Sequence, residues 1–299
     1  MSQTKITELY GLPTTSDPPG GWAAVAAEQA CPYLGRKCLK NRKSAPEQTI
    51  GSCTVSHGRP AGGIVICPHR LLDRRQVFTD CLHLLALHEP GNELHVVPEL
   101  NVPGGSVDYC LVSVRGGKDR DFVGIELQTL DTTGTVWPER QRFLRTHGVV
   151  VRAADADSGK PYGMNWKMTA KTILVQLHHK VGTFQHVGKP LALVVQSPLL
   201  RHMQKQFDFH HLHASPMLGD AMHFHAYDLL PGDSENRLQL VERLSTDRDG
   251  IAKCLGLKGE ANLELDELLT QIEAKLTTNT RWAIGGSTPL APAAIDVSE

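Results

Sequence analysis

Four cysteines in one short stretch limit how the N-terminal part of this chain can fold. Cys31, Cys38, Cys53 and Cys67 fall within 37 residues, in the spacing C-x6-C-x14-C-x13-C. The stretch is rich in turn-forming residues and has little apolar periodicity, so it can bury only a small core. Four thiolates in a tetrahedron suit zinc or iron, and a bound metal would contribute folding free energy that burial cannot supply. Because no C-x-x-C pair is present, the spacing equally allows four independent thiols.

The rest of the chain is long enough for a sizeable core. It has 299 residues, of which 40% are hydrophobic and 21% charged, as in ordinary globular proteins. No secretory signal and no run of about 18 apolar residues is visible, so we expect a cytoplasmic protein without a membrane span and with reduced thiols. The formal net charge of -1 argues mildly against DNA binding. It does not exclude DNA binding, since affinity for phosphates depends on where Lys and Arg lie.

Apolar periodicity predicts alternating strands and helices, and therefore an α/β or α+β core. Two strand-like segments, 107–114 and 122–130, are joined by turn-forming residues at 116–119, which predicts a hairpin. Further helices are predicted at 74–88, 163–181, 235–246 and 263–276, and further strands at 191–195 and 221–229.

These segments suggest a division of the chain into five parts. We expect a loosely packed N-terminus at 1–21, a four-cysteine module at 22–72, a core at 73–232, C-terminal helices at 233–280 and a disordered tail at 281–299.

Two acids converge if the predicted hairpin pairs as expected. Asp108 begins the first strand, and Glu126 and Gln128 share one face of the second. Two adjacent carboxylates repel each other unless positive charge lies between them, and Mg²⁺ is a natural occupant. Mg²⁺ can polarise a phosphoryl oxygen and lower the pKa of attacking water. The pattern therefore predicts a catalytic centre of these three residues, although a strand-surface carboxylate and a turn cap would give the same spacing.

Basic side chains gather in two places where they could contact DNA phosphates or be ordinary solvated surface. The first group lies inside the cysteine stretch and the second on the predicted helix 163–181. These residues are Arg36, Lys37, Lys40, Arg42 and Lys43, and then Lys167 and Lys171.

Five histidines gather toward the end of the core. They are His210, His211, His213, His223 and His225. Because their spacing matches no metal-binding pattern, we expect ordinary surface or core histidines rather than a second metal site.

Four phrases of the sequence are more specific than either pattern alone. They are ACPYLGRKCLKNRK at 30–43, GSCTV at 51–55, IVICPHRLLDRR at 64–75 and FVGIELQTLDTTGTV at 122–136. In this order they resemble the NotI family of restriction endonucleases, which includes EagI and is similar to the PD-(D/E)xK nucleases. The resemblance runs from about residue 25 to residue 230.

The resemblance implies an α/β fold with a PD-(D/E)xK nuclease core, in which helices flank a mixed central sheet. A loop-rich four-cysteine metal-binding subdomain would precede this core. Asp108, Glu126 and Gln128 would form the nuclease centre with Mg²⁺, and the four cysteines would bind a structural iron, although thiolate ligands alone also suit zinc. Two departures from the nuclease pattern are Val107 in place of Pro and Gln128 in place of the usual Lys.

The activity that the resemblance implies is type II restriction: Mg²⁺-dependent cleavage of both strands of double-stranded DNA at a GC-rich palindrome. A homodimer would match the symmetry of such a site, and a cognate DNA methyltransferase would belong to the same restriction-modification system.

Two other functions stay open on the sequence. A non-catalytic, sequence-specific DNA-binding protein with a structural four-cysteine metal site would explain Gln128 and the near-neutral charge. A redox or iron protein would use the cysteine site itself, and replacing Glu126 would then leave its activity intact.

Overall fold

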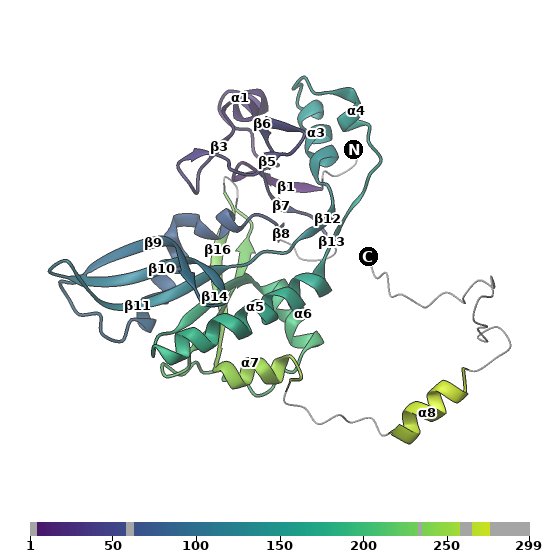
Figure 1. Cartoon of the computed structure of the whole chain (residues 1–299). Coiled ribbons are helices and arrows are strands. Elements are labelled where there is room, and N and C mark those ends of the chain that lie inside the picture. Colours follow the sequence, from purple (N-terminus) through teal and green to yellow (C-terminus); the bar gives the residue numbers. More distant parts are fainter. Residues whose placement is uncertain (1–4, 58–62, 233–234, 258–264, 276–299) are drawn as a thin grey trace.

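A mixed six-stranded sheet forms the centre of the computed structural model, which describes residues 5–57, 63–232, 235–257 and 265–275 (Figure 1). The strand order is β16-β15-β14-β11-β10-β9. The strands are β9 (Glu93–Val102), β10 (Gly105–Arg115), β11 (Lys118–Leu127), β14 (Leu191–Gln196), β15 (Met222–Leu230) and β16 (Arg237–Thr246). β11, β14 and β15 are parallel, and the remaining pairings are antiparallel. The predicted α/β class with a mixed central sheet is confirmed.

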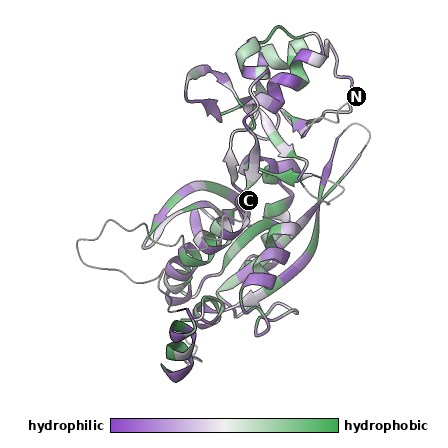
Figure 2. Ribbon diagram, turned by 90° about the vertical axis from the view of Figure 1, so that its right-hand side faces the viewer, coloured by the Kyte–Doolittle hydropathy of each residue, from purple (hydrophilic) through white to green (hydrophobic). Residues whose placement is uncertain are grey.

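Helices cover both faces of this sheet. One face carries α5 (Trp166–His186), α6 (Ser197–Gln206) and α7 (Arg248–Cys254), and the other carries η1 (Pro68–Arg75), α2 (Gln76–Cys81) and η2 (Leu82–Leu84). Side chains of β14 alternate between the two cores, with Leu193 on the α5 side and Val194 on the α2 side. Figure 2 accordingly shows strongly apolar ribbon at the centre of the molecule.

The N-terminal part forms a separate group of short strands above the central sheet (Figure 1). Its four-stranded sheet contains β1 (Ile6–Leu9), β2 (Leu12–Pro13), β7 (Ser52–Val55) and β8 (Ile64–Val65). Two ribbons, β3 (Ala30–Cys31) with β4 (Arg36–Lys37) and β5 (Asn41–Arg42) with β6 (Ala45–Thr49), lie with α1 (Gly21–Glu28) in the same part. The start of the chain, which we expected to be loosely packed, therefore contributes β1, with Ile6 and Leu9 fully buried.

The remaining elements complete the described part of the chain. α3 (Trp137–Thr146) and α4 (Ala153–Ala156) pack beside the N-terminal strands, and β12 (Thr132–Gly134) pairs with β13 (Tyr162–Met164). α8 (Leu265–Glu273) has no buried residue. None of these helices is long and apolar enough to cross a membrane, as far as the described residues go.

Most predicted elements are present, with two differences. The hairpin, the helix at 163–181, the strands at 191–195 and 221–229 and the helix at 263–276 are confirmed by β10 and β11, α5, β14, β15 and α8. The helix predicted at 235–246 is wrong: this segment is β16, which pairs with β15 along its length. The helix predicted at 74–88 is shorter than expected: α2 begins only at Gln76, because Arg74 and Arg75 adopt left-handed backbone with φ of 51° and 56°, and the 3-10 turn η2 that follows it ends at Leu84. The predicted disordered tail lies outside the described residues.

Two histidines are fully buried in β15. His223 and His225 have no exposed surface. Within the described residues, Nδ1 of His223 and Nε2 of His225 have no hydrogen-bond partner. The pKa of His223 is lowered to about 4, mainly by burial, and that of His225 to about 3, by burial and by the nearby guanidinium of Arg243. Both imidazoles are therefore neutral in the folded protein, as expected of core histidines.

Acid should destabilise the protein through this pair. The folded-state pKa values lie below the ordinary 6.5, so the unfolded chain binds more protons once the pH falls under 6.5. Stability is complete above that pH and declines from 6.5 toward 4 and 3, by about 1.4 kcal/mol per pH unit for each imidazole. Urea unfolding between pH 7.5 and 5 measures this slope. His223→Gln with His225→Gln should flatten it, whereas His210→Gln, at an exposed side chain, should not. An unchanged slope in the double variant would contradict this assignment.

Candidate active site

The predicted hairpin places Asp108 and Glu126 at the same end of two paired strands. Tyr109 of β10 pairs with Ile125 of the antiparallel strand β11. Asp108, just before Tyr109, and Glu126, just after Ile125, therefore occupy the next pair of opposite positions. Oδ2 of Asp108 accepts a hydrogen bond of 2.8 Å from the backbone N–H of Leu127. This bond fixes the Asp108 side chain across the strand pair, beside Glu126.

Both carboxyl groups are harder to ionise than usual. The pKa of Glu126 is raised to about 7: burial raises it most, the hydrogen bond from Lys180 lowers it, and the adjacent Asp108 raises it. Burial also raises the pKa of Asp108, against the Leu127 N–H and the charge of Lys180, which lower it. Near neutral pH, little free energy is therefore needed to remove the proton from Glu126 when a cation binds.

The donor set of this acid pair fits a hard divalent cation. Lys180 occupies Oε1 of Glu126 and Leu127 occupies Oδ2 of Asp108. In the part of the chain that the structure describes, no hydrogen bond engages the other oxygen of either carboxyl. One or two carboxylates with room for water and phosphate are the usual protein contribution to a Mg²⁺ site.

Asp108 and Gln128 open into a cleft of about 660 Å³ between the central sheet and the N-terminal strands. The β10–β11 side of this cleft also includes Tyr109, Leu127, Thr129 and Asp131. The backbone N–H of Gln128 is bonded to Val194 of β14, and its side chain borders the cleft. The opposite wall contains Arg36 and Lys40 from the cysteine stretch. The cleft thus sets basic side chains opposite Asp108, while Glu126, which is buried, does not line it.

Three further residues of this region were not predicted as site residues. Lys180 of α5 donates to Glu126, and His69 and Glu99 line the cleft. Glu99 lies across from the Asp108 end of β10 and adopts left-handed backbone with φ of 53°, which is uncommon for this residue type. Lys180 is separated from Glu126 by 54 positions in the sequence, so no local motif could have revealed the pair.

The four cysteines of the N-terminal part are free and buried. Burial raises the pKa of Cys31, Cys53 and Cys67, and each of these thiols also feels the charge of another member of the set: Cys38 acts on Cys31 and Cys67, and Cys67 on Cys53. No group of three or more His, Cys, Asp or Glu side chains within the described ranges is arranged to hold a metal ion.

The basic residues predicted for DNA contact differ in their exposure, in their hydrogen bonds and in whether they line the cleft. Lys37 and Lys40 donate to the backbone oxygens of Glu47 and Ile66, and Arg36 and Lys43 are exposed. Lys167 and Lys171 are exposed on α5 and do not line the cleft.

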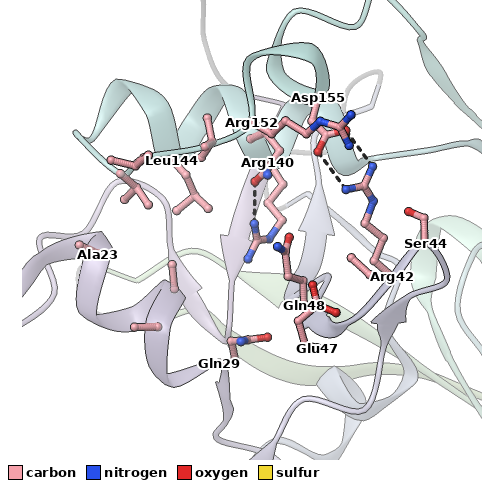
Figure 3. Close-up of a pocket in the computed structure, with 17 residues that line it drawn as sticks. Ala23, Gln29, Arg42, Ser44, Glu47, Gln48, Arg140, Leu144, Arg152 and Asp155 are labelled. Carbon is pink, nitrogen blue, oxygen red and sulfur yellow. Dashed lines mark hydrogen bonds and ion pairs between the residues drawn. The ribbon is translucent and has the colours of Figure 1, made fainter.

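Arg42 connects two parts of the structure instead of lining the cleft. It forms two hydrogen bonds of 2.9 and 2.7 Å with Asp155 of α4, at a second pocket (Figure 3). Its guanidinium also lies 4.6 Å from the ring centre of Trp137. These contacts fix the cysteine stretch against α3 and α4.

Comparison with known proteins gives one family. The model described as "Restriction endonuclease NotI" matches residues 24–240. The matched region includes the four cysteines, the acid pair and Gln128, and α5. No curated protein matches the chain.

Proposed function

This chain belongs to the NotI family of restriction endonucleases, and we propose that Asp108, Glu126 and Gln128 form its catalytic centre. Family membership makes the chain a site-specific DNA endonuclease rather than a non-catalytic binding protein or a redox protein. The observation that carries the proposed centre is the meeting of Asp108 with Glu126 at the end of β10 and β11, beside a cleft with a basic opposite wall.

The proposed reaction is Mg²⁺-dependent hydrolysis of one phosphodiester in each DNA strand. Asp108 and Glu126 would hold the cation, which supplies charge neutralisation and acidifies its bound water. The side-chain amide of Gln128 would orient water at the cleft, although an uncharged amide cannot offset charge. Glu99 could provide a further carboxylate on the β9 side of the cleft. These residues fix the position of the phosphate and water, which is most of what phosphodiester hydrolysis requires from a protein.

The cleft wall formed by the cysteine stretch would hold the DNA. Of the basic residues predicted for DNA contact, Arg36 and Lys40 line the cleft. Their charges would attract the phosphates, and guanidinium or ammonium groups can also reach guanine edges. Lys37 and Lys43 would extend this wall. Lys167 and Lys171 would contact DNA only if the DNA reached α5. Arg42 would act indirectly, by supporting the wall.

We further propose that the four cysteines bind a structural iron or zinc ion. Their burial and mutual electrostatic influence support this assignment. Four thiolates would leave no open coordination position, so the ion would stabilise the module rather than react. The cleft wall belongs to the same stretch as the cysteines, so the ion would also keep Arg36 and Lys40 in place.

The nature of the DNA site belongs to the same proposal. A GC-rich palindrome, a homodimer of matching two-fold symmetry and a PD-(D/E)xK arrangement of the core would be consistent with the family. A cognate methyltransferase would protect the same sequence from cleavage.

Replacing Glu126 tests the proposed centre. Glu126→Gln should slow cleavage on the order of 10³-fold, because it removes several kcal/mol of cation-dependent transition-state stabilisation. Cleavage of plasmid DNA containing a cut site is followed at several Mg²⁺ concentrations, and EDTA should abolish it. DNA binding in Ca²⁺ should persist.

Asp121→Asn is the matched control. Asp121 is a second buried carboxylate of β11 and also pairs with a lysine at 2.6 Å, in this case Lys189. This variant should cleave DNA near the normal rate once its stability is accounted for. Full activity of Glu126→Gln, or equal losses in the two variants, would rule out the centre proposed here.

The metal content of the purified protein tests the cysteine site. We expect about one iron or zinc ion per chain by elemental analysis, with visible absorption only in the case of iron. Cys38→Ser and Cys67→Ser should lose the ion and unfold at lower temperature, while Cys254→Ser, at a buried thiol beside α5, should retain it. A metal-free wild-type protein of normal stability would refute the site.

A further inference from the structure

One buried ammonium connects the two strands that carry the acid pair. Lys180 of α5 is 6% exposed. Its Nζ donates to Oε1 of Glu126 on β11 and to the backbone oxygen of Ser106 on β10, both at 2.6 Å. Ser106 precedes Asp108 by two residues, so this single group fixes β10 and β11 relative to each other at the site.

Glycines of the β9–β10 turn allow this turn to lie directly against α5. A Cβ at Gly104 would come within 2.9 Å of Cβ of His179, and a Cβ at Gly105 within 3.4 Å of Cε of Lys180. Both glycines have positive φ, of 96° and 129°, which other residues rarely adopt. The turn therefore closes onto the part of α5 that carries Lys180.

The next turn of α5 is held equally closely. Oγ1 of Thr183 donates to the backbone oxygen of Pro103 at 3.2 Å. On β11, a Cβ at Gly124 would lie 2.5 Å from the ring of Phe184, so only glycine lets the helix approach this strand. The position of Lys180 is thus set by contacts on both acid-bearing strands.

Lys180 also borders Gln128. A small space of about 10 Å³ is lined by Lys180, Glu126 and Gln128, together with Gln176 and three aliphatic side chains of α5 and β14. This volume is near the lower limit for one water molecule. An ammonium has three N–H donors, of which two are taken by Glu126 and Ser106.

We propose that Lys180 is a positioning residue of the active site, which holds Glu126 in place and supplies from α5 the positive charge that the uncharged Gln128 does not. The inference rests on the proposed catalytic centre and adds the residue that organises it. Lys180 acts through Glu126 and Gln128, since it does not line the cleft.

The direct test replaces Lys180 with Met, which keeps the aliphatic stem and removes the charge. Single-turnover cleavage should slow about 10²-fold, the usual effect of losing one preorganised charged or hydrogen-bonding group. DNA binding in Ca²⁺ should be unchanged. Calorimetric binding of Mn²⁺ to the protein without DNA should not weaken, because removing a neighbouring positive charge favours a bound cation.

Lys189→Met is the matched control, because Lys189 forms the corresponding 2.6 Å ion pair with Asp121 on the same strand. It should leave cleavage within the experimental error of wild type once thermal stability is accounted for. Equal losses of stability, Mn²⁺ affinity and cleavage in both lysine variants would show that Lys180 is only a structural ion pair.

Moving the charge onto the strand separates the roles further. Gln128→Lys in the Lys180→Met background should cleave DNA at least tenfold faster than Lys180→Met alone. This double variant also keeps one positive charge beside Glu126, so it remains informative even if Lys180→Met alone folds poorly. No recovery in a folded double variant, or normal cleavage by Lys180→Met, would overturn the inference. Normal cleavage by Glu126→Gln would instead refute the proposed catalytic centre. Failure of the Lys180 inference and failure of the catalytic centre therefore give different results.

Discussion

Glu126 is a carboxylate buried at the end of a central strand, and its pairing with Lys180 is the contact on which the site depends. Burying two opposite charges is unfavourable unless they are close and well hydrogen-bonded. Here the distance is 2.6 Å, and the ammonium has a second acceptor in Ser106. The pair requires α5 to lie against β10 and β11, which the glycines of these strands allow. Even with this pair, the pKa of Glu126 is about 7, mainly because the carboxyl is buried. A further positive charge beside Glu126 would therefore stabilise its ionised form.

A cleft, rather than an enclosed pocket, lies in front of this acid pair. One side is formed by β10 and β11 of the central sheet and by the exposed edge strand β9, and the other is a loop-rich stretch with little core of its own. The second side needs external support. Arg42 supplies part of it through its hydrogen bonds with Asp155 (Figure 3) and its contact with the ring of Trp137. The proposed thiolate-bound ion would supply the rest. A duplex held between the two walls would meet fixed acids on one side and basic groups on the other.

Local patterns in the sequence predicted the hairpin, α5 and the buried strands, because period-2 and period-3.6 repeats report directly on which faces are buried. They also brought Asp108 and Glu126 together, since hairpin pairing depends on the turn between the strands. The helix predicted at 235–246 was wrong because Leu238, Leu240 and Leu244 suit either period, and the pairing with β15 decided for a strand. Lys180 and Glu99 were not assigned: the first meets its partner only through the packing of α5, and the second comes opposite Asp108 only through β9, a strand that the sequence patterns did not predict.

The central claim is that this cleft cuts DNA at one defined sequence by means of a divalent cation. The most direct measurement is digestion of a large, fully sequenced, unmethylated and GC-rich DNA by the purified protein with Mg²⁺, followed by sequencing of every fragment end. The account predicts discrete fragments whose ends all derive from one palindromic sequence, and none in EDTA. Ends scattered over unrelated sequences, or intact DNA on several GC-rich substrates, would contradict it.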